Sequence, residues 1–157
     1  MPSGESEGKP DDVAFRPRVI IAGFGLPGRS IADSLEIAHI PYSVIEVNAD
    51  VVDRCLHIGR HMIRGDVRDP AILREAGIET ADILALMVPV EAIVLDAIDI
   101  ARSLRKDIKI IARTSFTSTG MDADKRGADR VIVAEQVVAA AAANVVKEMI
   151  KTLPVLH

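Results

Sequence analysis

An apolar run, Val19-Ile20-Ile21-Ala22, leads directly into Gly23-Phe24-Gly25-Leu26-Pro27-Gly28, which has the pattern Gly-x-Gly-x-x-Gly. The apolar run predicts a buried strand, and the residues after Gly28 repeat their apolar positions at helical spacing. A strand that passes through a glycine turn into a helix brings free N–H groups and the positive end of the helix dipole together, which favours binding of a nucleotide phosphate. Gly23 is expected to permit the tight turn, Gly25 the approach of phosphate to the backbone, and Gly28 the packing of helix on strand.

The composition of the 157 residues fits a single domain with a buried parallel sheet. Aromatic residues make up only 3% of the chain, so Ile, Val, Leu and Ala must build the core, as in sheets that helices cover on both faces. A net charge of -4 disfavours a nucleic-acid-binding protein, which normally carries a basic face. Cys55 is the single cysteine and cannot form an internal disulfide, which fits a reducing compartment.

Short apolar runs alternate with helical patterns from Arg18 onward, which is typical of βαβ units. Strands are predicted over Arg18–Ala22, Tyr42–Val47, His61–Arg64, Ile83–Met87, Lys109–Thr114 and Arg130–Val133. Helices are predicted over Gly28–Ala38, Ala49–Ile58, Pro70–Ala76, Val90–Leu104, Gly120–Arg126 and Ala134–Lys151. This order predicts an α/β fold, Rossmann-like and doubly wound, with parallel strands in the spatial order 3-2-1-4-5-6.

The two ends of the chain are predicted to lie outside this fold. Residues 1–17 are rich in Gly, Pro, Ser and acids and are expected to be a flexible tail or linker, residues 18–151 the nucleotide-binding domain, and residues 152–157 a C-terminal tail. The N-terminus lacks the pattern of a signal peptide. Residues 131–149 are the most apolar candidate for a membrane span, but Glu135, Lys147 and Glu148 interrupt them, so no direct insertion into a membrane is expected.

Glu46 lies 18 positions after Gly28, where the dinucleotide fingerprint expects an acid. A carboxylate there accepts bonds from both ribose hydroxyls and repels a 2′-phosphate, which favours NAD or an adenosine nucleotide over NADP. The alternative is a solvated acid at a strand end. Val47 and Asn48 follow at the same edge, and Asn48 either extends the ribose contacts or caps the next helix.

Further candidates follow the third, fourth and fifth strands. Gly65, Asp66 and Val67 are expected at the adenine side of the cleft, where Asp66 either accepts a bond from the adenine amino group or binds its own backbone in a turn. Met87 and Val88 follow the fourth strand, across the topological switch point, and are expected to form a wall of the cleft. Arg113 lies at the carboxyl end of the fifth strand, where it reaches a phosphate or a partner subunit or is simply an exposed arginine.

Neither a catalytic group nor a metal site is predicted. Tyr42 is the only tyrosine and no lysine follows it by four residues, which excludes the Tyr-Lys pair of short-chain dehydrogenases. The chain has no Gly-x-Ser-x-Gly elbow. Cys55 and His57 are two positions apart on a predicted helix and so face different directions, while His61 belongs to the next strand. These three side chains are therefore not expected to bind a metal together.

The glycine turn and Glu46, together with several other motifs, resemble the TrkA-N family, whose members are also called RCK or KTN domains. These motifs are Gly65-Asp66-Val67-Arg68-Asp69-Pro70, Leu73-Arg74-Glu75-Ala76-Gly77-Ile78, Ala81-Asp82, Ile110-Ile111-Ala112-Arg113 and Gly127-Ala128-Asp129. The resemblance covers Arg18 to about Met149 and is strongest toward the cytosolic domains of Kef-type monovalent cation:proton antiporters.

This resemblance implies a regulatory domain, without catalysis, that binds NAD(H) or AMP, ADP or ATP. It also implies a homodimer that gates a membrane-embedded potassium or other monovalent cation transporter, in cis or in trans, and a cytoplasmic location at the inner membrane through that partner. By resemblance, the three glycines form the phosphate turn, Glu46 holds the ribose, and Asp66 and Val67 line the adenine site. The helix Ala134–Lys151 would cross to the other subunit; the alternative is a helix packed on its own sheet.

Two departures from the family pattern bear on the ligand and on the chain. Relatives often carry arginine between the second and third glycines, where this chain has Leu26-Pro27, and proline has no N–H to donate to a pyrophosphate. The phosphate contact is therefore expected to be weaker unless Arg29 compensates, and AMP is expected to compete well with NAD. The smaller C-terminal ligand domain that often follows is absent from this sequence.

Three other functions compete with the transporter domain. An S-adenosylmethionine-dependent methyltransferase also uses a glycine turn and two acids, but Met87-Val88-Pro89-Val90 lacks the acid and the aromatic residue that many such enzymes carry there. A small NAD-dependent oxidoreductase would need a catalytic group that the sequence does not show. A stand-alone soluble redox or nucleotide sensor shares every motif with the transporter domain, so the sequence does not separate these two.

Overall fold

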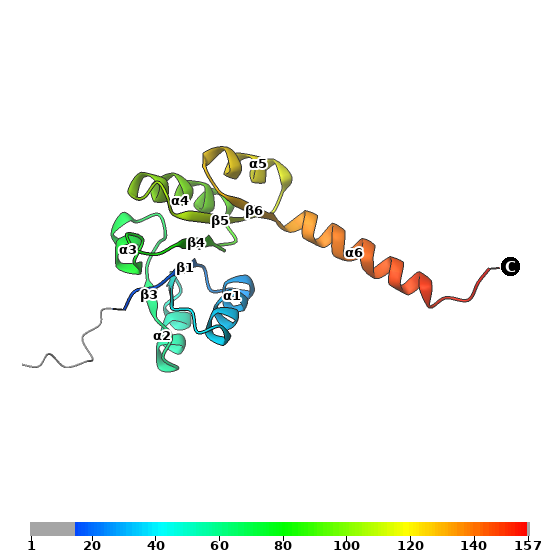
Figure 1. Cartoon of the computed structure of the whole chain (residues 1–157), viewed down its shortest axis with the longest axis horizontal. Coiled ribbons are helices and arrows are strands. Elements are labelled where there is room, and N and C mark those ends of the chain that lie inside the picture. The colour runs from blue at the N-terminus through cyan, green and yellow to red at the C-terminus, as the bar shows by residue number, and fades with distance from the viewer. Residues whose placement is uncertain (1–14, 157) are drawn as a thin grey trace, which may run out of the picture.

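The protein alternates strands and helices along its described length (Figure 1). The structure, a computed structural model, describes residues 15–156, so most of the predicted N-terminal tail lies outside the described residues. The elements are β1 Val19–Ala22, α1 Leu26–Ile37, β2 Tyr42–Glu46, α2 Ala49–His57, β3 Met62–Arg64, α3 Pro70–Ala76, β4 Ile83–Leu86, α4 Glu91–Leu104, β5 Lys109–Thr114, α5 Thr117–Arg126, β6 Arg130–Val133 and α6 Ala134–Lys151.

The strands form one sheet in the order β3-β2-β1-β4-β5-β6, and every neighbouring pair is parallel. The predicted fold class and strand order are thereby confirmed. Because all strands run the same way, all their carboxyl ends lie at one edge of the sheet. We call this the carboxyl edge. The winding of the chain reverses between β1 and β4, which are paired, so the topological switch point lies at the carboxyl ends of these two strands.

Helices cover the two faces of the sheet and divide the core into two clusters. Ile21 of β1 packs in a cluster that contains Ala32 of α1 and Val52 of α2. Ile20, the neighbouring residue, belongs to a cluster on the other face that contains side chains of α3, α4 and α5. Successive residues of a strand point to opposite faces, so the nearly continuous apolar strands are those of a sheet buried on both sides.

Local capping explains where the shorter helices begin and end. Asp69 caps α3 by accepting a bond from the N–H of Ala71 (2.9 Å), and Pro70 occupies the first helical position, where a missing N–H costs nothing. Gly77 ends the same helix at φ 100°, a left-handed conformation that favours glycine. Two helices begin earlier than predicted, α1 by two residues and α5 by three.

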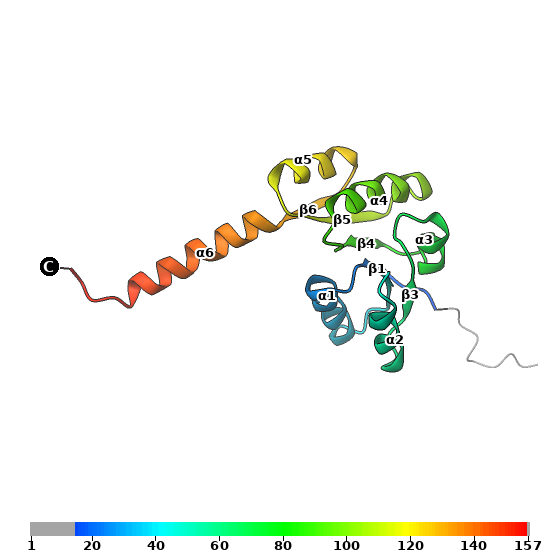
Figure 2. The ribbon, with the colours of Figure 1, turned by 180° about the vertical axis from the view of Figure 1, so that it is seen from behind.

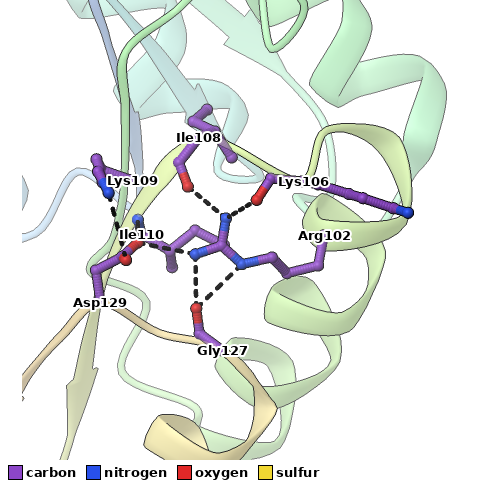
Figure 3. Close-up of polar contacts among 7 residues, drawn as sticks. All are labelled: Arg102, Lys106, Ile108, Lys109, Ile110, Gly127 and Asp129. Carbon is purple, nitrogen blue, oxygen red and sulfur yellow. Dashed lines mark hydrogen bonds and ion pairs between the residues drawn. The ribbon is translucent and has the colours of Figure 1, made fainter.

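Arg102 of α4 links three segments that meet beside β5 and β6 (Figure 3). Its guanidinium donates to the carbonyl oxygen of Gly127 (2.7 Å from Nη2), to the carbonyls of Lys106 and Ile108, and to the carboxylate of Asp129 (2.8 Å). Asp129 also accepts a bond from the N–H of Ile110 (2.8 Å). The Gly127-Ala128-Asp129 motif therefore has a structural role, because it joins the end of α4 to β5 and to the turn before β6.

Helix α6 leaves the domain instead of covering it. It follows β6 without an intervening residue and projects away from the sheet in both views (Figures 1 and 2). None of its residues is buried. The alternative in which this helix packs on its own sheet is therefore wrong. Among residues 15–156, no helix combines the length and the apolar character needed to cross a membrane.

Candidate functional site

Packing requires glycine at two positions of the turn, Gly23 and Gly28, whereas Gly25 borders open space. Gly23 has φ 94°, and a Cβ there would lie 3.0 Å from backbone atoms of Met87 and Val88. A Cβ on Gly28 would lie 1.9 Å from the carbonyl oxygen of Gly23, so only glycine lets α1 approach the turn this closely. A Cβ on Gly25 would meet nothing within 4 Å. The chain is therefore tightly packed behind the turn and open in front of Gly25.

Helix α1 points its amino end at this open space. Gly25 is its N-cap residue and makes no side-chain cap, and Leu26 and Pro27 are the first two helical residues. The first turn of a helix leaves its N–H groups without helical partners, and proline has none, so Leu26 and Gly28 offer the donors. Arg29, which is exposed, brings a positive charge to the same turn. This arrangement suits an anion.

Glu46 connects the end of β2 to the glycine turn. One carboxylate oxygen accepts a bond from the N–H of Phe24 (3.2 Å), and the other accepts bonds from the N–H groups of Val47 (2.7 Å) and Asn48 (3.3 Å). The side chain is half-buried. Glu46 is thus more than a solvated acid at a strand end, because it accepts bonds from two loops of the carboxyl edge and lines the space between them.

Asn48 caps α2, because its carboxamide oxygen accepts bonds from the N–H groups of Asp50 (3.0 Å) and Val51 (3.3 Å). The cap is one of the two roles that the sequence suggested for this side chain. A ribose contact through the remaining amide group stays a prediction.

Asp66 binds Arg68 in the turn after β3. Its carboxylate accepts bonds from the backbone N–H of Arg68 (2.8 Å) and from the guanidinium (2.7 Å). The bond from the Arg68 side chain lowers the pKa of Asp66 below its ordinary value. Gly65 beside it accommodates Ile72, since a Cβ on Gly65 would lie 2.5 Å from the Ile72 side chain. The turn role of Asp66 is present in the structure, and its adenine contact stays a prediction.

A small recess at the carboxyl edge brings Glu46 and Asp66 together with parts of the loops after β1 and β4. Its volume is about 60 Å³, and it lies at the switch point. It is lined by Ala22, Gly23, Ile45, Glu46, Val47, Gly65, Asp66, Val67, Val88 and Ile93. Sequence reasoning did not select Ala22, Ile45 or Ile93. Ile93 lies in the first turn of α4. An apolar residue directly after the loop that follows β4 is the sequence signal that could have identified it as part of the recess.

The remaining sequence candidates lie outside this recess. Met87 is buried behind the turn, where its N–H donates to the carbonyl of Ala22 (2.8 Å). Phe24 faces a separate cavity of about 260 Å³ between α1 and α2, which also contains Cys55 and three arginines. Arg113 is half-buried at the end of β5, paired in register with Ile132 of β6 and two strands away from β1. The structure therefore does not bring Arg113 together with Glu46 and Asp66.

Within residues 15–156, no cluster of three or more His, Cys, Asp or Glu side chains is arranged to hold a metal ion. Cys55 is buried on α2, and His57 is exposed on the same helix. His61 instead stacks on Phe15, with ring centroids 4.1 Å apart. Cys55, His57 and His61, the residues considered as metal ligands from the sequence, therefore lie in three separate surroundings.

The family model described as the TrkA-N domain matches residues 19–134. The chain is 27% identical over 135 residues to the putative cation/proton antiporter YbaL of Escherichia coli K12, covering 86% of this chain and 24% of YbaL. It is 28% identical over 125 residues to the putative K(+) efflux antiporter KefB of Alkalimonas amylolytica, covering 78% of this chain and 19% of KefB. The chain thus spans a quarter or less of these relatives.

Solved structures share the same fold. The TrkA-N domain of E. coli YbaL superposes with a TM-score of 0.81 at 26% identity, over 85% of this chain and 98% of that domain. The Kef C-terminal domain of Shewanella denitrificans in its AMP-bound form reaches 0.73 at 19% identity, over 86% and 81%. The GsuK channel bound to NAD reaches 0.68 at 22% identity, over 78% and 22%.

Proposed function

Because this chain belongs to the TrkA-N domain family, we propose that it is a regulatory domain that binds an adenine nucleotide or NAD(H) and controls a transporter of potassium or another monovalent cation. Structures of this fold carry such ligands, NAD in the GsuK channel and AMP in the Kef C-terminal domain. The matched relatives are named as cation antiporters. Binding without turnover is the simplest function for a site that presents no catalytic group among the described residues.

The observation that carries this proposal is the placement of Glu46 directly beside the open amino end of α1. The phosphate would bind the N–H groups of the first helical turn, where the helix dipole favours negative charge. The ribose would lie against Glu46, which would exchange part of its bonds to Phe24 and Val47 for bonds to ribose hydroxyls. The base would enter the recess beside Val67 and Asp66.

The same geometry bears on which nucleotide binds. Pro27 removes one donor from the helix end, so a pyrophosphate finds fewer donors here than at a helix end without proline, whereas a single phosphate needs fewer. Glu46 repels a 2′-phosphate, which disfavours NADP. We therefore propose that AMP competes well with NAD for this site, with Arg29 supplying part of the missing phosphate contact.

The partners follow from α6 and from the relatives. A helix of 18 residues without a buried side chain is stable in solution chiefly when something covers it, and a second copy of the chain is the partner we propose. The homodimer would act on a transport protein embedded in the inner membrane, joined to this chain or bound to it, from the cytoplasmic side. A stand-alone soluble sensor is the alternative.

Calorimetry on the purified chain tests the ligand. We expect binding of AMP and of NAD, with AMP no more than tenfold weaker than NAD. Glu46→Ala should weaken both by at least tenfold, about 1.4 kcal/mol. Glu75→Ala, an exposed glutamate on α3, is the matched control and should bind like the wild type. Failure of AMP, ADP, ATP and NAD all to bind at millimolar concentration would refute the proposal.

A further inference from the structure

The carboxylate of Asp66 is occupied by a single residue, Arg68. Oδ1 accepts bonds from the backbone N–H (2.8 Å) and from Nε (3.1 Å) of Arg68, and Oδ2 accepts bonds from Nη2 (2.7 Å) and from Nε (3.3 Å). An ionised carboxylate has about four acceptor positions on its two oxygens. Each oxygen of Asp66 therefore already accepts two bonds, and little capacity remains for a ligand.

Asp66 connects Arg68 to the nucleotide recess. Asp66 and Val67 line the recess, whereas Arg68 is not among the lining residues. The base of a bound nucleotide would thus meet a carboxylate whose oxygens are already bound to a guanidinium outside the recess. The base and the Arg68 side chain therefore compete for the same acceptor.

The guanidinium of Arg68 can leave Asp66 without becoming a buried, unpaired charge. The side chains of Arg68 and Asp66 are 41% and 40% exposed, and exposed ion pairs contribute little because water solvates both charges when they separate. Asp96 on α4 also attracts the guanidinium: the bonds to Asp66 are the main cause of the raised pKa of Arg68, and the charge of Asp96 adds to it. A ligand can therefore displace the Arg68 side chain at a small cost.

The backbone holds Asp66 in place when this side chain leaves. The N–H of Arg68 closes a turn on the Asp66 carboxylate two residues earlier, and this bond does not depend on the side chain at position 68. Asp69 and Pro70 follow directly as the cap and first residue of α3. Variants of Arg68 should therefore keep Asp66 in the wall of the recess.

We propose that Arg68 sets the base selectivity of this site, because its guanidinium competes with the 6-amino group of adenine for the oxygens of Asp66. This inference rests on the proposed function. An analogue that cannot make a hydrogen bond to a charged group normally loses about tenfold or more in affinity. Here the adenine amino group gains its bond only when Arg68 loses one, which cancels most of that difference. The site should therefore accept purine mononucleotides with only a weak preference for adenine.

AMP and purine riboside 5′-monophosphate test this competition, because they share ribose and phosphate and differ only in the 6-amino group. Calorimetry on the wild type should give two affinities within about threefold of each other, whereas Arg68→Ala should bind AMP at least about tenfold more tightly than the analogue. Arg74→Ala removes the same charge from an exposed arginine on α3. It is the matched control and should keep the wild-type ratio of affinities.

A double variant identifies the acceptor of the amino group. Adding Asp66→Ala to Arg68→Ala should return the two affinities to within about threefold of each other, and thermal unfolding identifies any variant that loses its fold. An Arg68→Ala variant with the wild-type ratio, a wild type that already prefers AMP tenfold, or a double variant that still prefers AMP would overturn the competition and leave the proposed function intact. A wild type that binds neither an adenine nucleotide nor NAD would overturn both.

Discussion

Gly25 offers a way to separate nucleotide binding from folding. It is the N-cap of α1, its φ of -74° is available to any residue, and a Cβ there would meet nothing within 4 Å. Aspartate is among the best N-cap residues and interacts favourably with the helix dipole. Gly25→Asp should therefore leave the free energy of unfolding unchanged or raise it by a few tenths to about 1 kcal/mol.

The same substitution should strongly weaken phosphate binding. A carboxylate at Gly25 would lie where the phosphate approaches the helix end. Two unit charges about 4 Å apart near a protein surface repel by about 4 kcal/mol. Solvent and ions reduce this value, so we expect AMP affinity to fall by at least a hundredfold, which corresponds to about 2.7 kcal/mol.

Gly25→Asn is the matched control, because it has the same shape and capping ability without the charge. Calorimetry with AMP should rank the wild type first, Gly25→Asn next, and Gly25→Asp at least tenfold weaker than Gly25→Asn. Thermal unfolding should show that both variants are folded. If the two variants bound AMP equally well, the phosphate would not bind at the amino end of α1, and the proposed pose would be wrong.

Three further predictions concern stability. Gly28→Ala should cost roughly 1–3 kcal/mol or more in urea unfolding, because its Cβ would collide with the carbonyl oxygen of Gly23. Arg102→Met should cost roughly 2–3 kcal/mol by the same measurement, since it leaves half-buried carbonyls without their donor and removes one of the donors to Asp129 (Figure 3). A loss under about 0.5 kcal/mol would contradict this role. Asp66 has a lowered pKa, so its pairing with Arg68 stabilises the fold above the ordinary aspartate pKa of about 3.9 and is lost as the pH falls through the lower folded-state value. The difference in melting temperature between wild type and Arg68→Ala should accordingly be largest near pH 7 and shrink toward pH 3.

The carboxyl edge shows which features of the candidate site can be predicted from local sequence and which cannot. The positions of Gly23, Glu46 and Gly65 at this edge follow from counting strands, because parallel strands end together. Their hydrogen bonds do not follow from counting. Glu46 is bound to the N–H of Phe24, 22 residues away, and only the folded chain brings these groups within 3.2 Å.

Helix boundaries show the same limit. Helix α5 begins at Thr117, three residues before the predicted start, because the N–H and hydroxyl of Thr117 both donate to the carboxylate of Glu135 (2.8 Å each). Glu135 lies in the first turn of α6, so the acceptor that stabilises the start of α5 comes from a later element. A local pattern contains no information on such a partner.

Local patterns were enough to establish the sheet, its strand order and the edge at which a ligand would bind, because apolar periodicity, glycine turns and right-handed crossovers are properties of short segments. The direction of α6 and the small volume of the recess beside Glu46 emerged only in the folded molecule. These features depend on how residues distant in sequence meet or fail to meet, and no short segment carries that information.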